Sequence, residues 1–343
     1  MRRRAAAMVC SAEGTERMIA AVMPEETKMR VVLQYAAGPA LRRTLGELEM
    51  RDRLEISVRP PEDRPAYESS MREAEVVWHL LDRVTSTLID ASPQLRLIQK
   101  IGVGVNTIDL EAARTRKVAV CNMPGTNTQA VAEMALLLML AVLRRLRALE
   151  EAVRTPAGWM LSQPCQDQLG ELGGRVVGLV GYGAVPARLA PILEAMGARV
   201  VFTNRSSRPE AVGQAMSLGA LLAESDIVSL HLPLTSDTEG LIDRAALSAM
   251  RPGAILINTA RGGLVDESAL VDALESGQLG GAGLDVFAEE PTLADNQLLA
   301  SDRVVVSPHT AWLTRETLAR SLEVATENCR RLRDGRPLLH RVV

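Results

Sequence analysis

From residue 30 onward, short apolar runs alternate with longer stretches whose apolar residues recur at helical spacing. In the first third of the chain, the apolar runs predict strands at residues 31–33, 54–58, 76–81, 95–98 and 118–120. Helical spacing between them predicts helices at residues 40–48 and 107–116. Nearly continuous apolar runs are typical of parallel strands buried on both faces. This part of the chain is therefore predicted to form an α/β unit.

The second half repeats the alternation. Strands are predicted at residues 176–180, 200–202, 226–232, 254–258, 281–286 and 304–306, and helices near 189–196, 208–218, 244–250 and 267–276. Six parallel strands with helices between them predict a doubly wound, Rossmann-type dinucleotide-binding domain. A last helix is predicted at residues 314–334, and the apolar tail 338–343 is expected to return to the first unit.

Residues 175–205 carry the motif around which the second unit is organised. A buried strand is followed by the turn Gly181-Tyr182-Gly183-Ala184-Val185-Pro186, a helical stretch and a second strand. Gly181 permits the tight turn and Gly183 the close approach of a pyrophosphate, while N–H groups of the helix N-terminus, at Ala184 and Val185, meet its negative charge. Pro186 stands where glycine normally allows close helix–strand packing, and proline is tolerated in the first helical turn.

Length and composition bound the possible functions. The 343 residues have room for two domains, and a net charge of −3 gives no reason to expect nucleic acid or an anionic membrane as partner. The longest apolar run, residues 134–143, is about half the span that a bilayer requires. The four cysteines form no C-x-x-C pair, so no metal site is expected, and isolated thiols fit a reducing cytoplasm. Residues 1–28 are expected to be a disordered extension or an upstream start.

Three polar residues follow predicted strands, at the sheet edge where ligands bind in open α/β folds. Arg261 follows the strand at 254–258, and its planar guanidinium is suited to hold a carboxylate; the alternative is a surface arginine in a loop. Glu290 and His309 follow the last two strands. A carboxylate that hydrogen-bonds an imidazole fixes its tautomer and favours its charged form, as proton transfer to a carbonyl oxygen requires. His79, His231 and His340 lack such a context and are interpreted as structural.

Five motifs in order, GLVGYG, HLPLTSDTEGLI, MRPGAILINTARGGLVDESAL, GAGLDVFAEEP and SPHTA, resemble those of the D-specific 2-hydroxyacid dehydrogenases, and the likeness extends from about Leu95 to the C-terminus. The resemblance implies an NAD(P)-dependent oxidoreductase in which Arg261 binds the substrate carboxylate and keto oxygen, His309 is the acid/base, and Glu290 orients it. It implies that Asp285 contacts the nicotinamide carboxamide, and that the backbone N–H groups of Val103 and Gly104 receive the carboxylate. The remaining site residues that it implies are Asn127 for substrate, and Pro233, Thr238, Thr259 and Ala260 for cofactor. Lys100, at the start of the loop that holds Val103 and Gly104, is a further candidate for substrate binding.

The same resemblance implies two Rossmann-like domains with the active cleft between them. A flavodoxin-like substrate domain would comprise residues 29–126 and 313–343, and the NAD(P)-binding domain residues 127–312. A long helix predicted at residues 129–150 is either a core helix with a basic end or a contact between domains or subunits. Together with a polar loop at residues 154–171, it favours a homodimer formed through the cofactor domains.

The end of the second strand of the Gly-rich unit predicts which cofactor is used. Asn204 occupies the position of the Asp that normally accepts from the ribose hydroxyls and repels a 2′-phosphate. Arg205 and Arg208 add charged donors, and Ser206 and Ser207 add hydroxyls, at the same turn. We therefore expect NADP(H) to be preferred and NAD(H) to remain possible; the alternative is an ordinary polar surface loop.

The substrate is less well defined than the reaction. A reductase of the glyoxylate/hydroxypyruvate type is the leading hypothesis; the alternatives are an enzyme like phosphoglycerate dehydrogenase and a dinucleotide-sensing binding protein like the corepressors that resemble this family. Lys100 either binds a second acidic group or is merely solvated. Trp159 and Trp312 either border the substrate pocket or serve ordinary packing.

Overall fold

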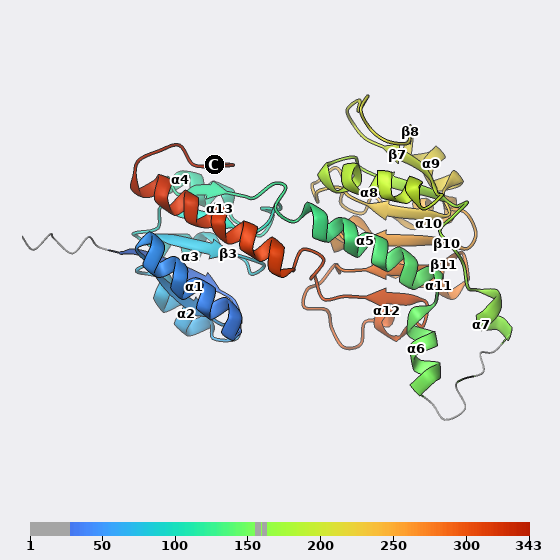
Figure 1. The fold of residues 1–343 in the computed structure, drawn as a ribbon, viewed down its shortest axis with the longest axis horizontal. Coiled ribbons are helices and arrows are strands. Elements are labelled where there is room, and N and C mark those ends of the chain that lie inside the picture. Colours follow the sequence, from blue (N-terminus) through green and yellow to red (C-terminus); the bar gives the residue numbers. More distant parts are fainter. Residues whose placement is uncertain (1–27, 155–158, 160–162) are drawn as a thin grey trace, which may run out of the picture.

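The computed structural model describes residues 28–154, 159 and 163–343. It contains two parallel sheets in separate lobes, and the chain crosses between the lobes before α5 (Thr128–Leu143) and before α13 (Arg315–Arg333) (Figure 1). This arrangement confirms the predicted α/β class with two Rossmann-like units. No helix of the described residues is both long and apolar enough to span a bilayer.

The first sheet has the strand order β2-β1-β3-β4-β5. Its strands are β1 (Met29–Gln34), β2 (Leu54–Arg59), β3 (Val76–His79), β4 (Leu97–Lys100) and β5 (Ala119–Cys121). Side chains of α1 (Pro39–Asp52) and α13 (Arg315–Arg333) share one apolar cluster with one face. The other face packs against α2 (Arg64–Met71), α3 (Ser86–Asp90) and α4 (Leu110–Thr115). The tail returns to this sheet as predicted, because the Val342 N–H donates to the Val120 carbonyl at 2.7 Å.

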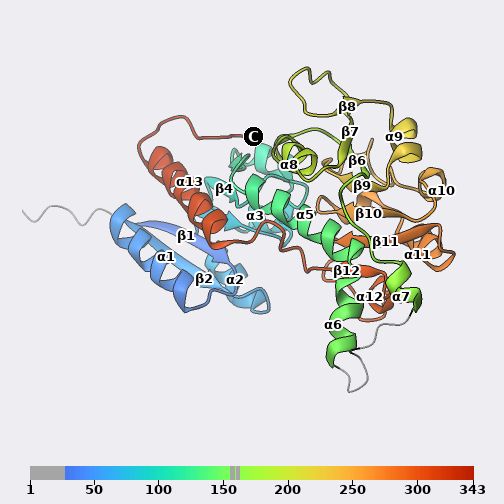
Figure 2. The ribbon, with the colours of Figure 1, turned by 45° about the vertical axis from the view of Figure 1, so that its right-hand side comes forward.

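The second sheet has the order β12-β11-β10-β9-β6-β7-β8. Its strands are β6 (Val176–Val180), β7 (Arg199–Thr203), β8 (Gln214–Ala215), β9 (Ile227–Leu230), β10 (Ala254–Asn258), β11 (Leu279–Leu284) and β12 (Val304–Val306). One face packs against α5 (Thr128–Leu143) and α8 (Ala184–Ala195), and the other against α9 (Leu218–Glu224), α10 (Arg244–Ala249) and α11 (Glu267–Glu275). In Figure 2, α5 starts on the side of the second lobe that faces the first lobe. Short elements are η1 (Gly262–Leu264) and α12 (Gln297–Ala300).

Two helix predictions are wrong. The helix expected at residues 129–150 is two helices, because α5 ends at Leu143 and α6 (Leu146–Arg154) starts after Arg145, whose φ of 48° is left-handed. The Arg145 guanidinium pairs with Asp302 at 2.8 Å, which holds this turn in place. The helix expected near 208–218 is absent from the described chain: residues 204–213 form a loop, the two-residue β8 adds a seventh strand, and α9 starts only at Leu218.

Several sequence predictions are not tested by these elements. Residues 1–27 and residues 155–158 and 160–162 of the predicted polar loop lie outside the described residues, and the described part of that loop contains α7 (Gln163–Asp167). The domain boundaries near residues 126 and 313 remain predictions, although each sheet lies on its own side of them.

Candidate active site

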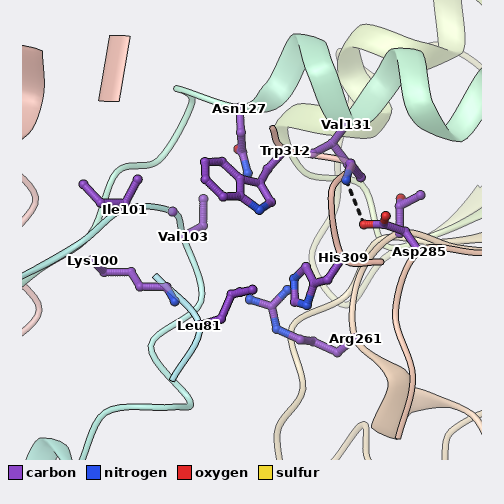
Figure 3. A pocket seen from close by; sticks show the side chains of 13 residues that line it. Leu81, Lys100, Ile101, Val103, Asn127, Val131, Arg261, Asp285, His309 and Trp312 are labelled. Carbon is purple, nitrogen blue, oxygen red and sulfur yellow. Dashed lines mark hydrogen bonds between the residues drawn. The ribbon is translucent and has the colours of Figure 1, made fainter. Parts of the chain in front are cut away.

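A cavity lies between the two sheets, at the carboxyl ends of their strands. Its empty volume is about 440 Å³, which includes space open to solvent. Residues from the first lobe, from the second lobe and from the two crossing segments line it: Leu81, Lys100, Ile101, Gly102, Val103, Asn127, Val131, Thr259, Arg261, Asp285, His309, Ala311 and Trp312 (Figure 3). The structure therefore brings together predicted site residues that lie up to about 200 positions apart in sequence.

His309 stands on the loop after β12 and is held there by two neighbours. Its backbone has a left-handed φ of 53°, and its N–H donates to the Asp285 carbonyl at 2.7 Å. The ring Nδ1 lies 2.6 Å from Glu290 Oε2, while Glu290 Oε1 accepts from the Phe287 N–H at 3.0 Å. Burial raises the pKa of the Glu290 carboxyl, but the hydrogen bond and charge of His309 outweigh it and the net pKa is lowered. This pairing leaves the ring Nε2 available to a ligand.

Arg261 follows β10, and its side chain lines the cavity. Its Nη1 donates to the Ala260 carbonyl at 2.6 Å, and its Nε lies 3.4 Å from Asn106 Oδ1. A Cβ on Gly104 would lie 2.0 Å from Arg261 Nη2, so the guanidinium would have to move if any other residue stood there. Burial lowers the pKa of the guanidinium, against the opposing charge of Glu290, and the group stays a cation. The contact of Asn106 with Arg261 was not predicted from the sequence, although Asn106 lies in the same loop as Gly104.

Asp285, at the end of β11, is buried and fully engaged. Its Oδ1 accepts from Ser307 Oγ at 2.6 Å and from the Thr310 N–H at 2.8 Å. Its Oδ2 accepts from the Ala311 N–H at 2.9 Å, the bond drawn as a dashed line in Figure 3. Burial raises the pKa of this carboxyl, even though these donors favour its charged form. Nearby, the Thr259 hydroxyl is buried without a partner among the described residues, so it is open to a bound group.

The wall from the first lobe carries Lys100 and Val103. Lys100 ends β4, is only 5% exposed and donates to the Leu80 carbonyl, so the alternative of a merely solvated lysine is wrong. Burial, and then the charge of Arg261, lower the pKa of its ammonium to about 7. Asn127 and Trp312 also line the cavity, whereas Trp159 is not among its residues and is 86% exposed.

The Gly-rich turn fits a dinucleotide pyrophosphate. Gly181 has a φ of 91°, and a Cβ there would lie 2.9 Å from the His231 carbonyl oxygen. Gly183 faces open space, since nothing lies within 4 Å of a Cβ built on it. It is also the N-cap of α8 without a side-chain capping bond, so the first N–H groups of the helix, from Ala184 and Val185, remain free for an anion.

The loop after β7 is tied to this turn. Asn204 Oδ1 accepts from the Tyr182 N–H at 3.1 Å, and its Nδ2 donates to the Ser206 carbonyl at 2.8 Å. The next residues, Arg205 to Arg208, are exposed. Across the turn, Thr238 Oγ1 donates to the Pro233 carbonyl at 2.7 Å.

Comparisons with known proteins agree with this geometry. Residues 136–311 match the model of the D-isomer specific 2-hydroxyacid dehydrogenase NAD-binding domain. The chain is 40% identical to a glyoxylate reductase from Aeropyrum pernix over 77% of this chain and 82% of that protein. It is 38% identical to a D-3-phosphoglycerate dehydrogenase from Mycobacterium bovis over 81% of this chain and 53% of that protein.

A solved structure shows the same fold. The TT0316 protein from Thermus thermophilus superimposes with a TM-score of 0.81 at 38% identity, over 92% of this chain and all of that chain. Together with the family match, the relatives and the two-lobed site, this likeness decides the assignment. The chain belongs to the D-isomer specific 2-hydroxyacid dehydrogenases and is an oxidoreductase that uses a nicotinamide dinucleotide.

Proposed function

We propose that this protein reduces a 2-keto acid to the D-2-hydroxy acid with NADPH as the preferred hydride donor, as a reductase of the glyoxylate/hydroxypyruvate type. The observation that carries the proposal is the 2.6 Å pair of His309 and Glu290, whose imidazole lines the same cavity as the Arg261 guanidinium. A proton donor and a carboxylate-binding cation in one cavity are what this reduction requires. The glyoxylate reductases among the relatives support the substrate type.

Each residue has a defined role in the proposed reaction. The Arg261 guanidinium and the backbone N–H groups of Val103 and Gly104 hold the substrate carboxylate and orient the keto carbon. When bound, the reduced nicotinamide would supply the hydride. Asp285 and the Gly-rich turn would help to position this cofactor. Protonated His309 gives its proton to the keto oxygen as negative charge develops there, and Glu290 stabilises the imidazolium in the correct orientation. The neutral imidazole then regains a proton from solvent.

A panel of 2-keto acids tests this function. Glyoxylate, hydroxypyruvate, phenylpyruvate and branched-chain keto acids are assayed for cofactor oxidation, with NADH and NADPH in parallel. Turnover of at least one of them to the D-hydroxy acid is expected. Complete inactivity together with tight cofactor binding would instead favour a dinucleotide-sensing binding protein.

The NADPH preference rests on the loop after β7. Asn204 presents a neutral amide there, so no carboxylate at this position repels a 2′-phosphate. Both polar atoms of the amide are hydrogen-bonded within the protein. Arg205 and Arg208 are exposed beside it. A charge-assisted hydrogen bond contributes roughly 1.5–3 kcal/mol, so kcat/KM should be at least about tenfold higher with NADPH. Arg205→Ala should raise the KM for NADPH with little effect on NADH, and a wild-type preference for NADH would contradict the assignment.

A homodimer formed through the second lobe is part of the proposal. No residue of α6 is buried, and Leu146 and Val153 on this helix are 50% and 61% exposed. Leu137 on α5 and Trp159 add further exposed apolar surface. Apolar area of this kind is a feature of subunit contacts. Sedimentation should give twice the chain mass of 37.0 kDa, and a monomer at working concentration would contradict it.

A further inference from the structure

The Lys100 ammonium is buried at the cavity without an acidic partner. It is 5% exposed, it lines the cavity from the end of β4, and its one hydrogen bond goes to the neutral carbonyl of Leu80. Among the ion pairs of the described chain, none includes Lys100. The protein itself therefore does not neutralise this charge.

The acidic groups of the cavity are occupied elsewhere. Asp285 accepts from three donors, and Glu290 is taken by His309 and the Phe287 N–H. His79, the neighbour of Lys100 in the first lobe, donates from its ring to the Asp82 carbonyl, and burial lowers its pKa to about 3, so it is uncharged. The charge that acts on Lys100 is that of Arg261, a second cation, and it lowers the pKa of the ammonium further.

Two cations line one cavity, Lys100 buried and Arg261 half-buried, and a monocarboxylate needs only one of them. Burying a charge without a counter-ion is costly, and such a group is retained at a functional site where a ligand supplies the opposite charge. The proposed reaction already uses Arg261 for the carboxylate next to the keto group. The walls near Lys100 are otherwise apolar, with Leu81 and Ile101 lining the same cavity.

We propose that Lys100 binds a second anionic group of the substrate, so that the reductase uses a 2-keto acid with a carboxylate or phosphate beyond the keto carbon better than a monoanionic 2-keto acid of similar size. This inference rests on the proposed function, because it assigns Arg261 to the first carboxylate. The residue type is consistent with it: of 39 basic residues only Lys28, Lys100 and Lys117 are lysines. An ammonium is a compact point charge that meets either anion without the two-pronged geometry of arginine.

The test measures kcat/KM with NADPH for three keto acids that differ in charge. 2-Ketobutyrate is the monoanion, oxaloacetate carries a second carboxylate, and 3-phosphohydroxypyruvate carries a phosphate. Compared with 2-ketobutyrate, wild type should prefer at least one of the two acids with a second anionic group about tenfold or more, and the better of the two identifies the anion. Lys100→Met should lower kcat/KM for that dianion about 30-fold or more, and for 2-ketobutyrate less than about fivefold. Lys117→Met, at an exposed lysine, is the matched control and should leave all three values unchanged.

Binding without turnover separates this inference from the proposed reaction. Calorimetry of the same three acids, with NADP⁺ bound so that no reduction occurs, should show the dianion binding more tightly to wild type than to Lys100→Met. Lys100→Cys treated with 2-bromoethylamine, which rebuilds a lysine-like amine, should regain the preference, with treated wild type as control. Equal losses for all three acids, or no dianion preference in wild type, would overturn the role of Lys100. Absence of turnover with every acid would overturn the proposed function, while calorimetry would still decide on Lys100.

Discussion

The two walls of the cavity differ in how their charges are compensated. On the wall from the seven-stranded sheet, Glu290 is paired with His309 and Asp285 accepts from three donors before any ligand binds. On the wall from the five-stranded sheet, Lys100 has only a carbonyl partner. Groups that transfer a proton gain from being oriented before the substrate binds. A cation that recognises an anion can instead stay unpaired until the bound anion supplies the opposite charge. The difference separates the proposed chemistry from the proposed selection of substrate.

The largest effect on substrate recognition is expected at Arg261, which belongs to the second lobe and whose guanidinium lies close to Gly104 of the first. Arg261→Gln removes two charge-assisted hydrogen bonds to the substrate carboxylate, each contributing roughly 1.5–3 kcal/mol. We expect kcat/KM to fall about 10²- to 10⁴-fold, with cofactor affinity measured by fluorescence unchanged. Arg261→Lys keeps the charge but loses the planar fork, and should retain an intermediate activity. A loss of cofactor affinity equal to the loss of kcat/KM would contradict the assignment.

Lys100→Met should stabilise the free protein while it impairs function. In the unfolded chain the ammonium keeps its proton up to its ordinary pKa of 10.5, whereas the folded protein releases it from about 7 upward. The free-energy cost of burying the Lys100 ammonium is therefore greatest below pH 7, and it declines as the pH rises toward 10.5. The substitution should raise the free energy of unfolding by about 1–4 kcal/mol, more at pH 6 than at pH 9, as measured by denaturant titration. A destabilised variant at pH 6 would show that Lys100 is already compensated.

Glu290→Gln tests the pair of Glu290 and His309 on the wall from the seven-stranded sheet. The amide preserves the shape of the carboxylate but not its charge, so the imidazolium that donates the proton is stabilised less. A hydrogen bond to a charged group contributes roughly 1.5–3 kcal/mol, and kcat should fall about tenfold to a hundredfold while the substrate KM changes less than about threefold. An effect confined to KM would assign Glu290 to substrate binding instead.

The smallest effect is expected at Tyr182, which fastens the cofactor loop. Its hydroxyl donates to the Val212 carbonyl at 3.1 Å and accepts from the Val212 N–H at 2.8 Å, while its own N–H binds Asn204 at the other end of the loop. Tyr182→Phe should loosen residues 204–212 and raise the KM for NADPH about two- to tenfold, with faster amide exchange at Val212. An equal rise for NADH would mean that the loop does not read the 2′-phosphate.

Much of the fold and of the site could be predicted because both follow from local rules. Buried parallel strands appear as apolar runs, and the residues after them must meet at one edge of a sheet, which placed Arg261, Glu290 and His309 together. The helix break at Arg145 could not be predicted, because it depends on an ion pair with Asp302, distant in sequence. The loop at residues 204–213 depends on its contacts with Tyr182, and the burial of Lys100 depends on how the lobes meet. Tertiary contacts decide these features.

The central claim is that His309 transfers the proton while other residues bind the cofactor, and His309→Ala tests it most directly. Steady-state oxidation of NADPH with the best keto acid is compared with NADPH affinity, measured by fluorescence on the same preparation. General acid catalysis typically contributes about 10²- to 10⁴-fold, so turnover should fall by that factor while the Kd for NADPH stays within about twofold of wild type. Turnover at the wild-type rate in His309→Ala would contradict the account.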